Sequence, residues 1–194
     1  MKFTNGYWVI KPEYDIHFAT QAVRARMDGR AFEVLGATRP IRGRGDMLDG
    51  PVLTVRFTAP AENVIRVRVT HFKGAAQKGP YLEMNEENAL PVFEETAEHW
   101  RFTSGALSAT VNRDGWGVTF EANGKTLTSS ANRAMACAKN QQTGRHYMIE
   151  SLNLDVGEKV YGLGERFTPY IKNGQVVDMW NEDGGTASEI AYKN

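Results

Sequence analysis

Cysteine and long apolar runs are nearly absent from this sequence, and each absence excludes a class of protein. The 194 residues include one cysteine, Cys137, which excludes an intrachain disulfide and a cysteine-rich metal site. No segment approaches the roughly 18 consecutive apolar residues of a membrane-spanning helix. The apolar run at residues 7–10 is too short for the apolar region of a signal peptide. We therefore expect a cytoplasmic protein with no membrane partner.

The sequence also lacks an excess of charge of either sign. Its 23 lysine and arginine residues balance its 23 aspartate and glutamate residues. Proteins that bind nucleic acids or anionic membranes broadly need clustered positive charge. The balance therefore predicts no nucleic-acid partner.

The few histidines and the single thiol give no pattern typical of a metal or cofactor site. Zinc requires three or four converging ligands, and no two of the histidines are four residues apart: they are His17, His71, His99 and His146. Cys137 lies in an apolar stretch, residues 134–138 (AMACA), which predicts a buried and unreactive thiol. We expect no metal site and no cofactor.

The dominant periodicity of the chain is two, which is typical of half-buried β-strands. In residues 64–72 the side chains of Ile65, Val67 and Val69 face one way, and polar side chains face the other. Similar alternation marks residues 52–58, 107–111, 116–120 and 146–154. We find no convincing amphipathic helix, and the acidic residues 83–97, interrupted by a proline, are expected to form a solvated loop.

Glycine pairs mark the turns between these strands. Asp28-Gly29, Asp114-Gly115 and Asn123-Gly124 are hairpin signals, because glycine adopts positive φ without steric cost. Residues 100–128 therefore read as a meander of short antiparallel strands. Many short strands with turns at this spacing predict an all-β fold, an antiparallel β-sandwich or a barrel.

The C-terminal quarter differs, because residues 157–194 are rich in glycine, acidic, amide and aromatic residues and have poor periodicity. We expect residues 1–156 to form the sandwich, and residues 157–194 to form its final part with a projecting loop. The Gly162-Leu163-Gly164 string does not predict a dinucleotide site, because the carboxylate of Glu165 would repel a phosphate.

Two short motifs in residues 157–194 contain the candidate functional residues. Residues 159–167 (KVYGLGERF) combine close glycines with charged and aromatic residues, and a buried ion-paired turn at Glu165 and Arg166 that closes the sheet is the simpler explanation. Residues 179–185 (MWNEDGG) place Trp180 and Asp183 on a glycine-containing loop. Aromatic rings cover the apolar face of a sugar and carboxylates accept its hydroxyl hydrogen bonds. A polar surface loop is the alternative.

These two strings resemble glycoside hydrolase family 31. Residues 161–166 (YGLGER), followed by residues 180–183 (WNED), carry the resemblance, and residues 1–8 (MKFTNGYW) resemble the start of its bacterial α-xylosidase branch. The resemblance covers essentially the whole chain. It implies an N-terminal β-sandwich of the galactose-mutarotase-like type, which in the family precedes a catalytic (β/α)8 barrel.

The resemblance also implies a mechanism whose catalytic groups lie outside this chain. Family members are retaining α-glycosidases, which need two carboxyl groups roughly 5 Å apart across the sugar. Both lie in the barrel, and no barrel pattern occurs here, so no catalytic residue is carried over. In the family, a loop of the sandwich contacts sugar hydroxyls. The resemblance therefore implies that Asp183 and Trp180 bind substrate and that Glu165 and Arg166 have structural roles.

Three hypotheses follow from the sequence. The first is the N-terminal domain of an α-xylosidase that removes terminal α-linked xylose from oligosaccharides, with the barrel of the same protein as its partner. The isolated chain is then expected to be inactive. The second is a freestanding carbohydrate-binding module, and the third is a structural or assembly domain. An apolar barrel-facing surface, exposed in isolation, would also allow a homo-oligomer.

Overall fold

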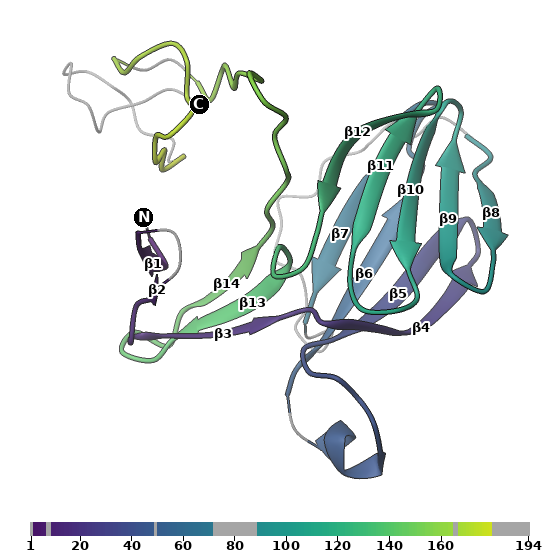
Figure 1. Cartoon of the computed structure of the whole chain (residues 1–194), viewed down its shortest axis with the longest axis horizontal. Helices are drawn as coiled ribbons and strands as arrows, with labels where there is room; N and C mark the ends of the chain where they lie inside the picture. Colours follow the sequence, from purple (N-terminus) through teal and green to yellow (C-terminus); the bar gives the residue numbers. More distant parts are fainter. Residues whose placement is uncertain (1, 7–8, 49, 72–88, 165–166, 180–194) are drawn as a thin grey trace. The chain divides into compact units, whose positions relative to one another are not determined.

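A computed structural model describes residues 2–6, 9–48, 50–71, 89–164 and 167–179 (Figure 1). The chain divides into two compact units, one of residues 10–153 and one of residues 1–9 with 154–194. Strands dominate the larger unit, as the alternating sequence predicts. Among the described residues, no helix combines the length and the apolar composition that crossing a membrane requires.

A four-stranded antiparallel sheet forms one layer of the larger unit. Its strands follow each other in sequence order: β4 (Gln21–Asp28), β5 (Ala31–Ala37), β6 (Val52–Thr58) and β7 (Arg66–Thr70). Asp28 pairs with Ala31, so the predicted hairpin is confirmed, with Gly29 and Arg30 as its turn. Gly29 has φ of 62°, a conformation that explains the glycine.

A five-stranded antiparallel meander forms the second layer. It comprises β8 (Val92–Glu95), β9 (His99–Ser104), β10 (Leu107–Asn112), β11 (Val118–Ala122) and β12 (Lys125–Ser130). Asn123 and Gly124, with φ of 52° and 75°, form the two-residue turn between β11 and β12. The predicted meander over residues 100–128 is confirmed.

The hydrophobic core lies between these two sheets, which face each other in Figure 1. Phe32 of β5 is fully buried, and its ring centroid lies 5.5 Å from that of Phe57 and 6.3 Å from that of Phe102. Phe93 of β8 completes the cluster at 5.0 Å from Phe32. Side chains from both sheets meet in this way in a β-sandwich, so the fold class expected from the sequence is confirmed.

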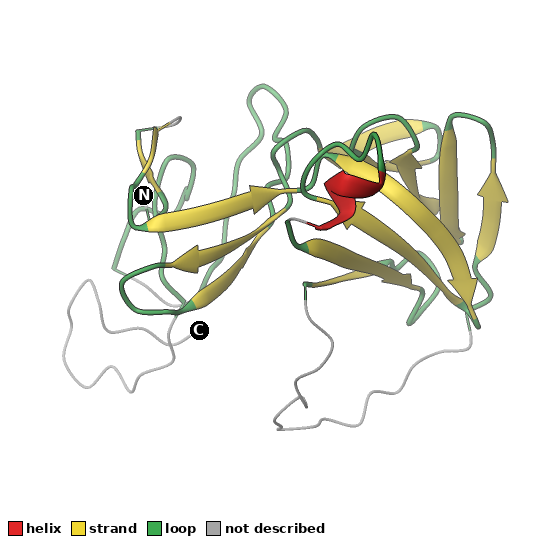
Figure 2. Ribbon diagram, turned by 90° about the horizontal axis from the view of Figure 1, so that it is seen from below, coloured by secondary structure: helices red, strands yellow, loops and turns green. Residues whose placement is uncertain are grey.

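A third, three-stranded sheet belongs to the same unit (Figure 2). Its order is β14 (His146–Ile149), β13 (Ala136–Asn140) and β3 (Tyr14–Phe18). Two further short strands, β1 (Thr4–Asn5) and β2 (Val9–Ile10), pair with each other. The sequence predicts β14, but the small residues of β13 give no alternation from which that strand could be recognised.

Two local expectations need correction, and one element was not predicted. Residues 92–95 form the edge strand β8, not a loop, because Phe93 packs on the core while Glu94 is exposed; residues 83–88 lie outside the described residues. The turn at Gly115 is wider than a tight hairpin, since Val111 pairs with Val118. A short 3₁₀ helix, Arg44–Leu48, lies between β5 and β6, drawn red in Figure 2.

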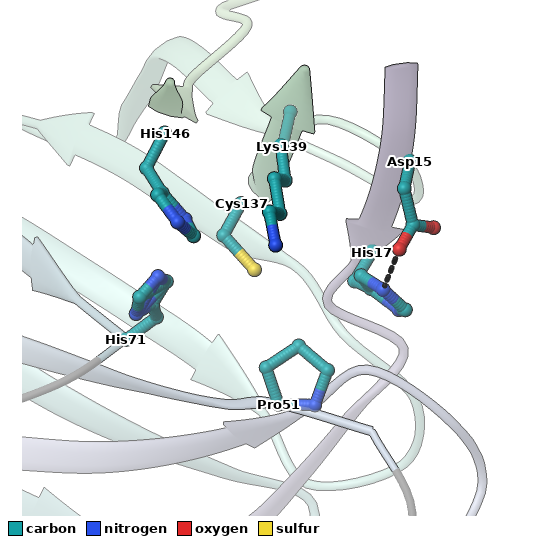
Figure 3. A pocket seen from close by; sticks show the side chains of 8 residues that line it. Asp15, His17, Pro51, His71, Cys137, Lys139 and His146 are labelled. Atoms are coloured by element: carbon teal, nitrogen blue, oxygen red, sulfur yellow. Dashed lines mark hydrogen bonds and ion pairs between the residues drawn. The ribbon is translucent and has the colours of Figure 1, made fainter. Parts of the chain in front are cut away.

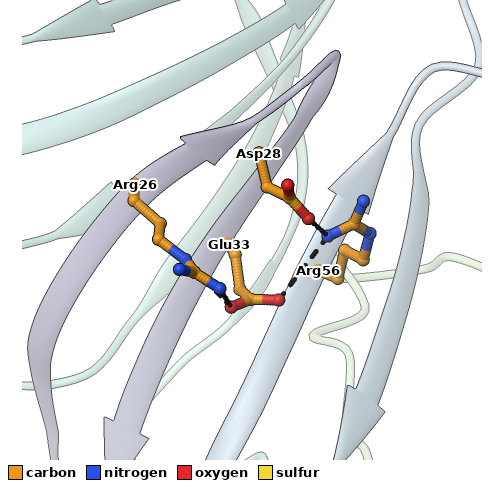
Figure 4. Close-up of polar contacts among 4 residues, drawn as sticks. All are labelled: Arg26, Asp28, Glu33 and Arg56. Carbon is orange, nitrogen blue, oxygen red and sulfur yellow. Dashed lines mark hydrogen bonds and ion pairs between the residues drawn. The ribbon is translucent and has the colours of Figure 1, made fainter.

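An ion-pair cluster lies on the outer face of the four-stranded sheet (Figure 4). The Glu33 side chain is 4% exposed, and its Oε1 accepts a hydrogen bond from Nη2 of Arg26 at 2.9 Å. Nη1 of Arg56 lies 3.5 Å from Oε2 of Glu33 and donates to Oδ2 of Asp28 at 2.6 Å. The two guanidinium groups compensate the charge of a carboxylate that the sheet surface removes from water.

Candidate functional site

The glycine string of the smaller unit forms a left-handed backbone segment. Gly162, Leu163 and Gly164 have φ of 89°, 65° and 85°. Glycine adopts these values freely, whereas a leucine does so rarely and at some cost. Two glycines one residue apart allow the sharp turn that these φ values give. Glu165 and Arg166, which follow it, lie outside the described residues.

A buried lysine holds the chain that follows this turn. Lys172 is 7% exposed, and its Nζ donates to Oγ1 of Thr168 at 2.8 Å and to the carbonyl oxygen of Pro169 at 2.7 Å. Its backbone N–H donates to the carbonyl oxygen of Val160 at 2.8 Å. A buried ammonium group needs such acceptors. Lys172 therefore joins the segments before and after the glycine turn.

Asn173 makes a second connection between the same segments. Its Oδ1 accepts from the backbone N–H of Val160 at 2.9 Å, and its Nδ2 donates to the carbonyl oxygen of Glu158 at 3.0 Å. A side-chain amide that donates and accepts in this way replaces a strand pairing. Sequence reasoning missed both Lys172 and Asn173, because their partners lie up to 15 residues away.

Aromatic side chains near the turn are exposed. Tyr161, Phe167 and Tyr170 have exposed fractions of 50%, 74% and 78%. The rings of Tyr161 and Tyr170 lie 5.1 Å apart between centroids. Exposed aromatic groups that gather on one unit are typical of a surface that binds a sugar or a neighbouring domain.

The two residues predicted to contact substrate, Trp180 and Asp183, lie outside the described residues. The description ends at Met179, and the carboxylate of Asp178 just before it lies 3.5 Å from Nζ of Lys2. The structure thus describes the chain that leads to the predicted sugar-binding loop.

The larger unit holds a separate pocket in which scattered titratable residues meet (Figure 3). It encloses about 170 Å³, and the rings of His71 and His146 lie on one side of it, 5.5 Å apart. On another side, Nε2 of His17 lies 3.1 Å from Oδ2 of Asp15. Sequence reasoning did not find this pocket, because the segments that carry its histidines are far apart in the chain and only the fold brings them together.

The pocket offers neither an activated thiol nor a set of metal ligands among the described residues. Cys137 lines it, and burial raises the pKa of the thiol, an effect to which the charge of Asp15 adds. The predicted burial of the thiol is confirmed, and a raised pKa disfavours the reactive thiolate. No group of three or more potential ligands in the described part of the chain could hold a metal ion.

Most of the chain matches the model of one protein family. Residues 54–194 match the family model described as the glycosyl hydrolase 31 N-terminal galactose mutarotase-like domain. The chain belongs to glycoside hydrolase family 31. The sandwich and the glycine turn are therefore those of a family 31 N-terminal domain, as the YGLGER and WNED strings predict.

Two curated relatives of this family 31 domain are α-xylosidases. The α-xylosidase XylQ of Lactiplantibacillus pentosus is 41% identical over 198 residues, which cover 100% of this chain and 26% of that protein. An α-xylosidase of Emericella nidulans is 34% identical, with 100% of this chain and 27% of that protein covered. The chain spans about a quarter of the length of these relatives.

A solved structure shares the fold of the family 31 domain. The dextranase of glycoside hydrolase family 31 from Flavobacterium johnsoniae matches with a TM-score of 0.62 at 12% identity, covering 90% of this chain and 20% of that one. At this identity the likeness shows the fold alone. It agrees with the sandwich described above.

Proposed function

We propose that this chain is the N-terminal domain of a retaining α-xylosidase that removes terminal α-linked xylose from oligosaccharides. One observation carries the proposal: two curated α-xylosidases match the chain over its whole length at 41% and 34% identity. We also propose a cytoplasmic location for the enzyme. The single cysteine supports it, because the chain needs no oxidising compartment for a disulfide.

The proposal places the catalytic carboxyl groups in the part of the protein that this chain does not span. Retaining glycosidases use one carboxylate as nucleophile and a second as acid and then base, roughly 5 Å apart. The relatives have about three quarters of their length outside the matched region. In our proposal a barrel there performs the chemistry, while residues 1–156 pack against it and residues 157–194 supply a loop at its mouth.

We assign substrate contact to Asp183, with Trp180 beside it. The support is chemical, since a carboxylate accepts hydrogen bonds from sugar hydroxyls and an indole covers a sugar's apolar face. The described chain before the loop adds support, because Lys172 and Asn173 hold it in place through hydrogen bonds of 2.7–3.0 Å. A loop fixed at its base can present one carboxylate to a bound sugar.

The test of this assignment is the hydrolysis of 4-nitrophenyl α-xyloside by the full-length enzyme. We expect Asp183→Ala to lower kcat/KM by about ten- to a hundredfold, because one carboxylate hydrogen bond contributes about 1–3 kcal/mol. Trp180→Ala should raise KM. Asp178→Asn is the matched control, because the Asp178 side chain is 80% exposed and its carboxylate lies 3.5 Å from Nζ of Lys2, a weak surface ion pair. Equal kcat/KM in all variants would remove Asp183 from the site.

The isolated 194-residue chain should show no turnover of the same substrate. Turnover that persists through repurification and disappears in Asp183→Ala would contradict the proposal. A carbohydrate-binding module is the alternative, and the exposed pair of Tyr161 and Tyr170 favours it. It predicts a saturable change in tryptophan fluorescence when the isolated chain is titrated with xylose oligosaccharides.

A further inference from the structure

The sandwich has an opening between the edge strands of its two sheets. A cavity of about 450 Å³ lies there, between β7 of the four-stranded sheet and β12 of the five-stranded sheet. We call it the edge groove. Its lining is Ile65, Val67, Val69, Leu107, Val118, Phe120, Leu127, Thr128, Ser130, Met135, Glu150 and Leu152.

The edge groove exposes the hydrophobic core. Val67, Val69 and Phe120 pack against the core but stay only partly buried. At its mouth Leu127 and Leu152 are 50% and 54% exposed. Covering apolar surface stabilises a protein by about 25 cal/mol per Å², so this opening favours association with a further apolar element.

A buried hydroxyl lies in the wall of the edge groove. Ser130 is 1% exposed, and its Oγ has no hydrogen-bond partner among the described residues. The Ser130 hydroxyl is near enough to Glu150 to favour its charged form, although no hydrogen bond joins the two side chains. Glu150 is exposed as a residue, but partial loss of hydration beside the apolar lining has the larger effect and raises its pKa. A buried polar group without a partner is costly, so the groove suits an occupant that carries one polar group.

Backbone groups border the same groove. In the described ranges, β7 and β12 are the last strands of their sheets. The C-terminal end of β12 is covered, because the N–H of Asn153 donates to the carbonyl oxygen of Ser129 at 2.9 Å. Among the described residues, residues 67–70 and 125–128 make no further backbone hydrogen bond outside their sheets, so an added strand could pair with these edges.

We propose that the edge groove receives an extended β-strand from the part of the same polypeptide that this chain does not span. The inference rests on the proposed function, since the relatives are about four times as long as the matched region, which is 26% of one and 27% of the other. A strand presents alternate side chains to one face. Its inward residues are apolar except for one hydrogen-bonding residue opposite Ser130.

The first test compares amide hydrogen exchange in the full-length protein and in the 194-residue chain. We expect amides of β7 and of the first half of β12 to exchange at least about tenfold more slowly in the full-length protein, equivalent to about 1.4 kcal/mol. Amides of β10, which lies inside its sheet, serve as the control for overall stability. Equal protection of β7 and β12 in both proteins would overturn the proposal.

A pair of lysine substitutions gives the second test. Leu127→Lys should accelerate exchange at β7 and β12 in the full-length protein by about tenfold or more and leave the 194-residue chain unchanged, because Leu127 is 50% exposed there. Val92→Lys is the matched control, on the opposite edge strand of the same sheet and 56% exposed. It should change neither protein. Identical behaviour of the two variants in the full-length protein would contradict the proposal.

Two other occupants would give different results. A second copy in the groove predicts that the 194-residue chain sediments as a dimer, that Leu127→Lys makes it a monomer, and that the full-length protein shows the same change. A small apolar ligand predicts that the full-length protein still binds 1-anilinonaphthalene-8-sulfonate in the groove. Either outcome overturns the proposal.

These results separate the docking proposal from the proposed function. Full-length protein that hydrolyses the α-xyloside while β7 and β12 stay unprotected overturns only the docking. Protected strands without any α-xyloside turnover would overturn only the proposed substrate.

Discussion

Glu33 illustrates how a single charged residue is accommodated on a sheet surface. Its side chain is 4% exposed, although it points away from the hydrophobic core. Arg26 and Arg56 lie over the carboxylate at 2.9 Å and 3.5 Å. The two arginine side chains are themselves 56% and 35% exposed, so they keep contact with water while they compensate the buried charge.

Removing this charge should destabilise the domain. We expect Glu33→Gln to lower the free energy of unfolding by about 1–3 kcal/mol, because the amide removes the compensating charge and turns one of the two acceptor oxygens into an NH2 donor that faces a guanidinium group. Glu94→Gln is the control, since Glu94 is exposed on the edge strand β8. It should change the stability by less than about 0.5 kcal/mol. Urea unfolding checks both; equal effects would show that the cluster adds nothing.

Glu150 should give the domain a specific pH dependence. Burial raises its pKa above 4.5 in the folded state, so the folded chain binds this proton more tightly than the unfolded chain does. The folded state therefore loses stability as the pH rises from about 4.5 through the raised pKa. Glu150→Gln removes the charge and should gain stability relative to the wild type at pH 7 but not at pH 4. If the stability difference between Glu150→Gln and the wild type were the same at pH 4 and pH 7, the charge of Glu150 would not be its cause.

At the scale of elements, β5 and the loop before β11 fit each other closely. A Cβ atom added at Gly36 of β5 would lie 2.8 Å from Cζ3 of Trp116. Trp116 is 6% exposed and belongs to the loop between β10 and β11. Glycine within a strand often marks such a close approach. The indole ring takes the space that a side chain would fill.

Gly36→Ala should therefore lower the free energy of unfolding by about 1–3 kcal/mol through overpacking. Gly43→Ala is the matched control, because a Cβ atom there meets nothing within 4 Å and the backbone has no positive φ. Thermal unfolding followed by near-ultraviolet circular dichroism would report both the stability and the Trp116 environment. Similar unfolding midpoints for the two variants would contradict the packing argument.

The elements differ in how far the sequence predicts them. β6 was predictable because Val55 and Phe57 alternate with polar residues, and the turn before β12 because Asn123-Gly124 suits positive φ. β13 was not, because four of its five residues are buried and no polar face remains to mark it. β8 is short and acidic, so only Phe93 indicates that it packs on the core.

At the scale of the whole molecule, the sequence predicts the family better than the site. The glycines of the YGLGER string are explained locally, because the backbone at Gly162–Gly164 is left-handed. Such a string can be recognised in the sequence alone, and the family model confirms the family that it indicates. The roles of Lys172 and Asn173, and the meeting of His71 with His146, depend on contacts between distant segments. Asp183 is assigned by its motif alone and stays a prediction.

The central claim is that this chain is one domain of a longer enzyme, and the mass of the native protein tests it most directly. The chain has a mass of 21.6 kDa and covers 26% of its α-xylosidase relative, so we predict a native polypeptide about four times heavier. Its remaining sequence should alternate strands and helices and carry paired aspartates. A native polypeptide of 21.6 kDa would contradict the account and leave sugar binding as the function to test.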